Sequence, residues 1–269
     1  MKYTVLTLFP EIIDAYFASS IMAKALNRGI MEYRAVNIRD YATDKHHTCD
    51  DAPYGGGAGM LMLAEPLGRA LDAVLAGTAD SSARGLTGER AHVIYLSPSG
   101  RPFNQARARE LAGKKELILI CGRYEGIDQR IIDCYVDEEI SVGDYVLSSG
   151  EVAALVLIDA TYRLVEQVIT PASLEEESFD PLLLEYPQYT RPENYDTVGG
   201  TLRVPEVLLS GHHENIRRWR LEKRVEKTLA LRPDLVRLGE ERGLFDAETR
   251  KIIEQKRLTT CKCPGEGER

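Results

Sequence analysis

Three short apolar runs, each followed at once by a glycine-containing turn, constrain the fold more than any other feature of the chain. The pairs of run and turn are 92–96 with 97–100, 117–121 with 122–126, and 139–142 with 143–150. Apolar runs of this kind predict buried strands of a parallel sheet. Because glycine lets the main chain approach a ligand closely, we expect the three turns to form one pocket walled mostly by backbone.

The overall composition is that of a soluble globular protein. The 269 residues are 43% hydrophobic and 28% charged, which is enough for one large domain or two ordinary ones. Residues 1–10 predict a short strand and not a signal peptide, and no stretch approaches the roughly 18–20 apolar residues of a membrane helix. We therefore expect a cytoplasmic protein that does not engage a membrane.

The net charge and the cysteine content limit the classes of function that the chain can have. The formal net charge of −8 argues against general affinity for nucleic acid, so an RNA-binding role would need a local basic patch. The five cysteines are scattered, and the close pair Cys261 and Cys263 lacks a second pair at zinc-site spacing. We expect all of them to be reduced and without a functional role.

Strand-like runs alternate with helical periodicity up to about residue 164, which predicts an α/β domain with a parallel sheet. Further strands are expected at 3–9 and 31–38, helices at 10–27, 63–75, 102–112 and 151–164, and a polar loop at 77–89. The helix at 151–164 is apolar on almost every side, so it should be buried.

The chain is expected to divide after this buried helix. Residues 165–178 have no stable periodicity and predict a linker between a domain at 1–164 and a smaller, all-helical domain at 179–269. Helices are expected at 211–230 and 246–256, with a turn at Arg232 and Pro233 and a frayed tail from Cys261.

A second glycine-rich segment lies at 50–60, where two acids precede four glycines in five positions. Such a sequence fits neither a helix nor a strand. It lacks the Gly-Lys-Ser/Thr ending of a phosphate-binding loop, and no Gly-x-Gly-x-x-Gly opens a helix elsewhere. Either the segment is a flexible loop, or its paired acids and Tyr54 are placed to recognise a ligand.

Charged side chains crowd the turn after the second apolar run, at Arg123, Glu125, Asp128 and Arg130. At the carboxyl end of a strand such groups usually meet a ligand, and the alternative is a solvated turn with incidental ion pairs. Arg163 stands near the end of the buried helix. It either caps that helix or directs a cation at a substrate oxygen.

The basic patch missing from the overall charge lies at 217–227, with Trp219 among its basic residues. Basic residues beside an aromatic ring can hold a nucleic-acid backbone. The interleaved glutamates also fit a helix with ion pairs four residues apart. The adjacent His212 and His213 have no third ligand at a useful spacing, so no metal site is expected there, and the acidic run at 175–177 alone predicts only a solvated face.

Six segments of the chain form a recognisable series. They lie at 50–60, 95–98, 121–128, 142–151, 189–192 and 209–213, and the segment at 142–151 has the sequence Val-Gly-Asp-Tyr-Val-Leu-Ser-Ser-Gly-Glu. In this order they resemble the bacterial tRNA (guanine-37-N1)-methyltransferases, the TrmD family. The resemblance extends over about residues 1–255, and motifs of this length are rarely shared outside the family.

The resemblance implies a SPOUT methyltransferase with S-adenosylmethionine bound in a deep C-terminal trefoil knot of the parallel sheet. It also implies a homodimer whose active site is shared between subunits. The residues alone would predict an open doubly wound sheet, because true knots are rare. The implied cofactor positions are Tyr95, Leu96, Ser97, Pro98, Gly100, Cys121, Gly122, Arg123, Tyr124, Glu125, Gly126, Ile140, Val142, Gly143, Asp144, Tyr145, Val146, Leu147 and Gly150.

The resemblance also assigns catalytic and substrate-binding roles. The family's base is an acid just before Ser-Phe in the linker, which is Glu177 in this chain. Other members have aspartate at this position, so the side chain that carries the carboxylate is one methylene longer here. Glu176 is the substitute for this role. Arg163 matches the family's substrate arginine. The expected tRNA contacts are Asp50, Tyr54, Arg217, Arg218 and Arg220.

The expected reaction is methyl transfer to N1 of the guanine at position 37, in the anticodon stem-loop of tRNA. Guanine N1 carries a proton that a carboxylate must remove, while negative charge moves to O6 beside Arg163. The base must leave the loop stack, and a linker that orders on RNA binding would deliver Glu177. A ribose 2′-O-methyltransferase and a non-catalytic RNA-binding protein remain alternatives, and the sequence leaves open whether Mg²⁺ assists.

Overall fold

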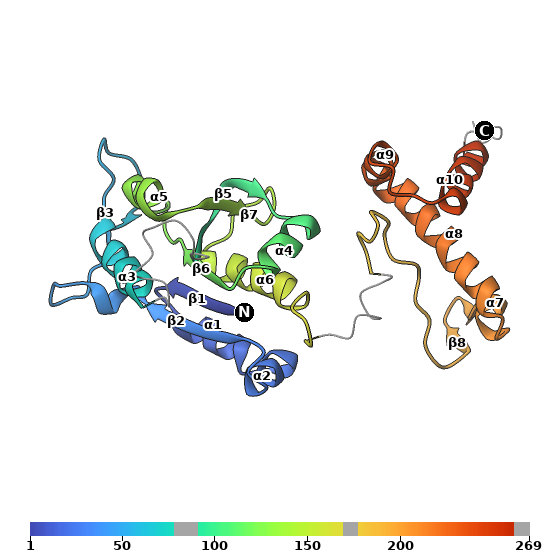
Figure 1. Cartoon of the computed structure of the whole chain (residues 1–269), viewed down its shortest axis with the longest axis horizontal. Coiled ribbons are helices and arrows are strands. Elements are labelled where there is room, and N and C mark those ends of the chain that lie inside the picture. Colours follow the sequence, from blue (N-terminus) through green and yellow to red (C-terminus); the bar gives the residue numbers. More distant parts are fainter. Residues whose placement is uncertain (78–90, 169–176, 261–269) are drawn as a thin grey trace. The chain divides into compact units, whose positions relative to one another are not determined.

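The computed structural model describes residues 1–77, 91–168 and 177–260 (Figure 1). The chain separates into two compact units, Met1–Thr170 and Pro171–Arg269. Most of the polar loop expected at 77–89, most of the expected linker, Glu176, and the tail from Cys261 lie outside the described residues. No helix in the described part of the chain is both long and apolar enough to cross a membrane.

The first unit is built on a five-stranded sheet in the order β2-β1-β6-β5-β7. Every strand pair in this sheet is parallel. The strands are β1 (Lys2–Thr7), β2 (Glu32–Asn37), β5 (His92–Pro102), β6 (Glu116–Cys121) and β7 (Glu138–Ser141). The three apolar runs of the sequence thus become neighbouring strands, and the turns after them leave the same edge of the sheet. The predicted parallel α/β architecture is confirmed.

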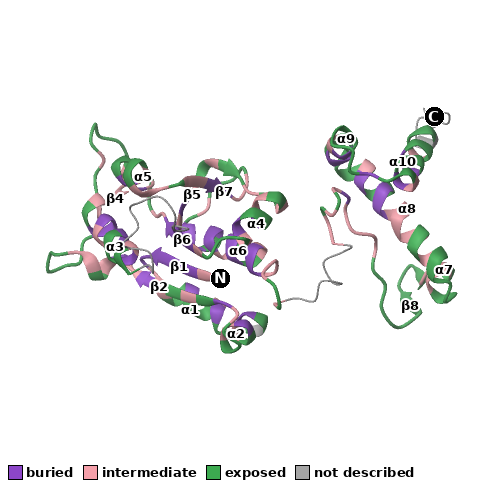
Figure 2. Cartoon of the chain, in the orientation of Figure 1, coloured by how far each residue is buried: buried purple, intermediate pink, exposed green. Residues whose placement is uncertain are grey.

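Helices cover both faces of this sheet and bury alternate strand residues. On β6, Leu117 and Leu119 belong to one core cluster, while Ile118 and Ile120 belong to the other, as the alternation of a strand requires. The first cluster includes residues of α1 (Pro10–Phe17), α2 (Ser20–Asn27), α4 (Gln105–Ala112) and α6 (Gly150–Tyr162). The second includes residues of α3 (Ala64–Ala76), α5 (Gln129–Tyr135) and the 3₁₀ turn η1 (Ile38–Tyr41). Figure 2 shows the resulting buried layer along β1 and β6.

Several helix predictions for this unit need correction. The helix expected at 10–27 is two helices, because Ser19 has extended backbone angles (φ −112°, ψ 152°) that interrupt the helix. The helix α6 is buried on one side only, since Val152 is 49% and Val156 44% exposed. The helix α5 was not expected, although Asp128 caps it by accepting a hydrogen bond from the Arg130 amide.

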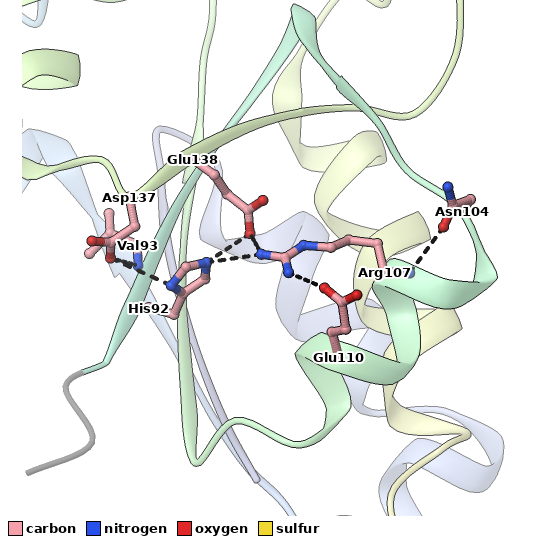
Figure 3. A network of polar contacts seen from close by, with 7 residues as sticks. All are labelled: His92, Val93, Asn104, Arg107, Glu110, Asp137 and Glu138. Carbon is pink, nitrogen blue, oxygen red and sulfur yellow. Dashed lines mark hydrogen bonds and ion pairs between the residues drawn. The ribbon is translucent and has the colours of Figure 1, made fainter.

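A network of polar side chains joins β5, β7 and α4 at the edge of the sheet (Figure 3). His92 Nε2 lies 2.7 Å from Glu138 Oε1, and Arg107 donates to the same oxygen and to Glu110. Asp137 accepts the amide of Val93 at 2.8 Å. Hydrogen bonds from Arg107 and His92 lower the pKa of Glu138, although its burial acts in the opposite direction.

The second unit is a helical assembly with one hairpin, so the prediction of an all-helical domain is wrong. Strands β8 (Asn194–Thr197) and β9 (Gly200–Arg203) pair antiparallel around Val198 and Gly199. The helices are α7 (Glu206–Leu209), α8 (His213–Leu231), α9 (Pro233–Glu241) and α10 (Ala247–Thr260). The turn expected at Arg232 and Pro233 is instead the start of α9, where proline fits the first helical position. Val225, Val236 and Phe245 belong to the core of this unit.

Candidate active site

A cavity of about 320 Å³ opens where the first unit's three glycine-containing turns meet. Its wall is formed by the ends of β5, β6 and β7, the turns after them and the start of α6. The lining residues are Tyr95, Leu96, Ser97, Pro98, Ser99, Gly122, Arg123, Tyr124, Glu125, Gly126, Ile140, Ser141, Val142, Gly143, Tyr145, Val146, Leu147, Ser148, Ser149, Gly150 and Ala153. The structure therefore brings the three turns together, as the sequence predicts.

Three of the expected cofactor positions, Gly100, Cys121 and Asp144, are not among the described residues that line the cavity. Gly100 packs against β7, because a Cβ placed there would lie 2.5 Å from the amide nitrogen of Ile140. Cys121 is 1% exposed, and burial and the nearby Glu151 raise the pKa of its thiol. A thiol in this state is a poor nucleophile, so Cys121 is part of the packing.

The first turn is an interruption inside β5. Both Leu96 and Arg101 pair with Ile140 of β7, so the residues between them leave the ladder and project from the sheet edge. Within this segment, Ser97 Oγ and Ser99 Oγ lie 2.7 Å apart. The strand is longer than the sequence indicated because it resumes after the turn and ends at Pro102.

The second and third turns touch through their backbones. The amide of Gly150 donates to the carbonyl oxygen of Gly122 at 2.8 Å. A Cβ at Gly150 would lie 2.7 Å from Cys121 Cα and from the Gly122 nitrogen, so only glycine allows this approach. Four further lining residues, Ser99, Ser141, Ser148 and Ser149, lie within or beside the predicted turns but are not among the individual cofactor positions expected from the sequence. Ala153, in the second turn of α6, lies outside the predicted glycine-containing turns and was missed.

The glycine-rich segment at 50–60 is attached to the second turn. It begins in the short ladder of β3 (Asp50–Asp51) and β4 (Leu61–Met62), and Met60 accepts the Glu125 amide at 3.0 Å. Tyr124 Oη donates to Asp50 Oδ1 at 3.1 Å, and burial together with this contact raises the pKa of the Tyr124 phenol. Asp50 thus stands beside the cavity, whereas Tyr54 is fully exposed.

Charged groups of the second turn have different surroundings. The guanidinium of Arg123 lies over the ring of Phe9, 4.6 Å from its centroid, and also lines the cavity. Asp128 and Arg130 form an exposed ion pair at 2.7 Å, which is the arrangement of the solvated-turn alternative. Of this charged set, Arg123 and Glu125 are therefore the side chains that face the cavity.

The two expected catalytic side chains do not line this cavity in the described part of the chain. Arg163 is the C-terminal cap of α6, whose first residue, Gly150, is at the cavity wall. The helix is thirteen residues long, which places its two ends about 20 Å apart. Glu177 belongs to the second unit, where its carbonyl accepts the amide of Asp180 at 3.3 Å.

The basic residues of α8 are engaged within the second unit. Arg217 pairs with Glu214 at 2.7 Å and with Glu248 at 2.8 Å, and Arg218 pairs with Glu222 four residues on. Arg220 lies over the ring of Tyr186, 4.7 Å from its centroid. The Arg218–Glu222 pair has the four-residue spacing expected for a helix with internal ion pairs. Exposed ion pairs are weak and can exchange for phosphate contacts.

Metal ligands do not cluster in the described residues. No group of three or more histidine, cysteine, aspartate or glutamate side chains there could hold an ion. His212 and His213 stand at the start of α8.

Comparison with known proteins decides the family. The family described as tRNA (guanine-1)-methyltransferase TrmD matches residues 1–238. This chain belongs to that family. The proposed resemblance is thereby confirmed over both units.

Close relatives of the family carry the same name, tRNA (guanine-N(1)-)-methyltransferase. The Treponema denticola protein is 59% identical over 255 residues, which cover 95% of this chain and 98% of the relative. The Treponema pallidum protein is 53% identical, with 95% and 96% covered, and the Borreliella burgdorferi protein is 56% identical, with 91% and 99% covered. The family match includes the whole cavity, since every lining residue falls within residues 1–238.

Proposed function

We propose that the chain transfers the methyl group of S-adenosylmethionine to N1 of the guanine at position 37 of tRNA. The observation that carries this proposal is the backbone-walled cavity at the ends of β5, β6 and β7, in a chain of the tRNA (guanine-1)-methyltransferase family. A cytoplasmic location follows from the proposed tRNA substrate.

The described residues fit the proposed cofactor. The cavity combines apolar side chains such as Leu96, Ile140 and Leu147 with main-chain amide and carbonyl groups, which suits a flat adenine with hydrogen-bonding edges. Its volume of about 320 Å³ lies at the small end of the range for ligand pockets. The cofactor would supply an electrophilic methyl group there.

Two side chains would act on the guanine. Glu177 would take the N1 proton, because a protonated N1 is a poor nucleophile and a carboxylate is the base that the expected linker position offers. Arg163 would stabilise the negative charge that develops on O6. The longer side chain of glutamate can act as this base when the linker places its carboxylate within hydrogen-bond distance of guanine N1. We assign the cofactor site to residues 1–164, the linker to 165–178 and tRNA contacts to 179–269.

A homodimer with shared active sites explains where Arg163 stands. Within one chain, the length of α6 holds this cation about 20 Å from the cavity end of the helix. Val152 and Val156 on α6 and Ile12 on α1 expose apolar surface, which a second copy of the chain would cover. In this arrangement, Arg163 and Glu177 of one subunit complete the cavity of the other. The trefoil knot belongs to the same proposal, supported by the close passage of Gly150 past Cys121.

The second unit would hold the anticodon stem-loop. The ring of Tyr189, which is 48% exposed, lies 6.3 Å from that of Trp219, and both stand near the arginines of α8. Aromatic rings can stack on unpaired bases, while Arg217, Arg218 and Arg220 would exchange their glutamate or tyrosine partners for phosphates. A local site of this kind is compatible with a net charge of −8, because it concentrates the cations on one helix.

The test is to locate the transferred methyl group. The protein is incubated with labelled S-adenosylmethionine and a tRNA transcript that carries guanine at position 37, and the digested RNA is analysed by mass spectrometry. We expect 1-methylguanosine at position 37, and no label in a matched transcript with adenine there. A label on a ribose 2′-oxygen would establish the alternative methyltransferase, and no transfer at all would favour the non-catalytic RNA-binding protein.

A further inference from the structure

A buried acid behind the cavity wall has no part in the chemistry proposed above. Glu151, in the first turn of α6, is 1% exposed. Its Oε1 accepts a 2.5 Å hydrogen bond from the hydroxyl of Thr7, at the end of β1. Its Oε2 is also buried and has no hydrogen-bond partner within the described chain. The side chain thus lies between the start of α6 and the cavity edge of the sheet.

The hydroxyl of Thr7 extends this contact to the next segment of the chain. Thr7 is fully buried, and its Oγ1 accepts the amide of Phe9 at 2.9 Å while it donates to Glu151. Phe9 is the residue that caps α1, and no side chain caps that helix. The Glu151–Thr7 pair therefore holds the backbone of the turn between β1 and α1.

Phe9 in turn supports a residue of the cavity wall. The guanidinium of Arg123 lies 4.6 Å from the centroid of the Phe9 ring, and Arg123 lines the cavity. A cation over an aromatic ring is held in place by the ring's negative face. The start of α6 is thus linked to the second turn twice, once by the Gly150–Gly122 backbone bond and once through Thr7 and Phe9.

A buried acid with one hydrogen bond is a poor choice for stability alone. Burying a carboxyl group with an oxygen left unpaired is unfavourable, and well-packed apolar residues often replace buried polar groups without loss. The amino-terminal end of α6 offsets part of this cost because it favours a negative group. The remaining cost is explained if the side chain has a task at the site.

We propose that Glu151 is a positioning residue that orients Thr7 and, through Phe9, holds Arg123 at the cavity wall. Its carboxyl group does not touch the reactants. Because Arg123 stands at the second turn, loss of Glu151 should disturb the alignment of the reacting groups more than the binding of the adenosine part, which the backbone of the turns would hold. The expected effect on kcat rests on the proposed methyl transfer. The series of contacts from Glu151 through Thr7 and Phe9 to Arg123 does not depend on it.

The first test needs no ligand. Amide hydrogen exchange of Phe9 is measured by NMR in the full chain and in the variants Thr7→Val, Glu151→Ala and Glu151→Gln. We expect exchange to be about tenfold faster or more in the first two variants, because the amide loses its anchored acceptor. The Gln variant should stay near wild type, since its amide oxygen can replace Oε1. Equal Phe9 exchange in all four proteins would overturn the proposal.

A matched control stands on the same strand. Thr4 is also fully buried on β1 and donates to an acid, Glu116, at 3.0 Å, but it lies toward the opposite end of the strand from the cavity. Thr4→Val should therefore leave Phe9 exchange unchanged. If Thr4→Val accelerated the amide exchange of Phe9 as much as Thr7→Val does, the cause would be a general loosening of the sheet. That result would contradict the positioning role.

The second test separates turnover from binding. We expect Thr7→Val and Glu151→Ala each to lower kcat about tenfold, with the calorimetric Kd for S-adenosylmethionine within about threefold of wild type. The double variant should be no worse than either single one, because both remove the same link. Glu151→Gln should restore kcat. Losses of kcat that add up in the double variant, or a loss confined to the Kd for S-adenosylmethionine, would refute the inference. An inactive wild-type protein that shows the expected Phe9 exchange pattern would refute only the proposed function.

Discussion

The amide of Gly150 donates a 2.8 Å hydrogen bond to the carbonyl oxygen of Gly122, which joins the start of α6 to the turn after β6. This contact closes the cavity wall between two segments that are 28 residues apart in the sequence. It requires that α6 begin with a residue that has no side chain, because Cys121 Cα and the Gly122 nitrogen occupy the space that a Cβ would take. This part of the cavity wall therefore requires glycine at position 150.

Gly150→Ala should weaken cofactor binding. The added Cβ would lie 2.7 Å from backbone atoms that cannot move without opening the two turns, so we expect the Kd for S-adenosylmethionine to rise at least about tenfold. Isothermal titration calorimetry measures the change. Gly77→Ala is the matched control, because its Cβ would meet atoms no closer than 3.5 Å. Similar affinities in both variants would show that the close approach does not shape the binding site.

Replacement of Glu177 should abolish turnover and spare cofactor binding. Removal of a general base typically costs 10²–10⁴-fold in rate, and we expect a kcat loss of about this size for Glu177→Ala. Glu177→Asp should retain much of the activity, because it keeps the carboxylate, and Glu177→Gln should not. Single-turnover methylation with saturating tRNA measures the rates. Unaltered turnover in Glu177→Ala would exclude this residue as the base.

Two inactive variants should complement each other if the active site is shared between subunits. Arg163→Ala removes the proposed O6 contact, and Leu147→Arg places a charged side chain in the cavity. Each variant alone should lose about 10²-fold or more in kcat. In a mixed dimer one site would receive an intact cavity from one chain and an intact Arg163 from the other. Co-expressed and separately tagged chains should therefore recover up to about half of the wild-type activity per mixed dimer.

The outcome of this mixing experiment is decisive for the placement of Arg163. If both groups came from one chain, every site in the mixed dimer would lack one of them, and no activity would return. Near-normal turnover in Arg163→Ala alone would assign this side chain to capping α6. Analytical ultracentrifugation of each variant serves as the control that the dimer forms.

Acidification should weaken the network around Glu138 (Figure 3). The pKa of Glu138 is lower in the folded protein than in the unfolded chain, so its contribution is present above the unfolded-state pKa and is lost as pH falls through the folded-state pKa. We expect Glu138→Gln to reduce the free energy of unfolding by about 2 kcal/mol at pH 7, because two charge-assisted hydrogen bonds are weakened. Urea unfolding at pH 7 and pH 4 measures the difference between wild type and variant. This difference should shrink at pH 4, and a constant difference would contradict the account.

The parts of the fold that follow from local pattern were predictable. The apolar runs at 92–96, 117–121 and 139–142 became β5, β6 and β7, and their turns formed the cavity, because burial on both faces leaves little choice but a parallel strand. The close passage of Gly150 past Gly122 was not predictable from these runs. It depends on packing between segments that are distant in sequence, which periodicity does not record.

Errors occurred where short signals competed with longer periodic ones. Helical spacing across 10–27 concealed the extended Ser19, and the hydrophobic valines of α6 were interpreted as buried although Val152 and Val156 are exposed. The hairpin of β8 and β9 was hidden because its residues are exposed on both strands, so it shows no alternation of apolar and polar positions. Its Gly199 and Gly200 were the available turn signal.

The basic patch shows why a sequence pattern alone cannot assign a binding surface. Arg217 and Arg218 fit both a phosphate contact and a helix ion pair, and in the free chain they contact Glu214, Glu248 and Glu222. The two interpretations differ in what happens on binding, because phosphates must displace these weak pairs. The salt dependence of tRNA affinity in charge-removal variants would therefore separate them more clearly than the structure of the free chain.

The most direct test of the central claim is an electron-density map of crystals soaked with S-adenosylmethionine. The account predicts the ligand in the cavity at the ends of β5, β6 and β7, with its adenine against the backbone of the turns at 122–126 and 143–150. Density for the ligand at any other place on the chain, with this cavity unchanged, would contradict the account.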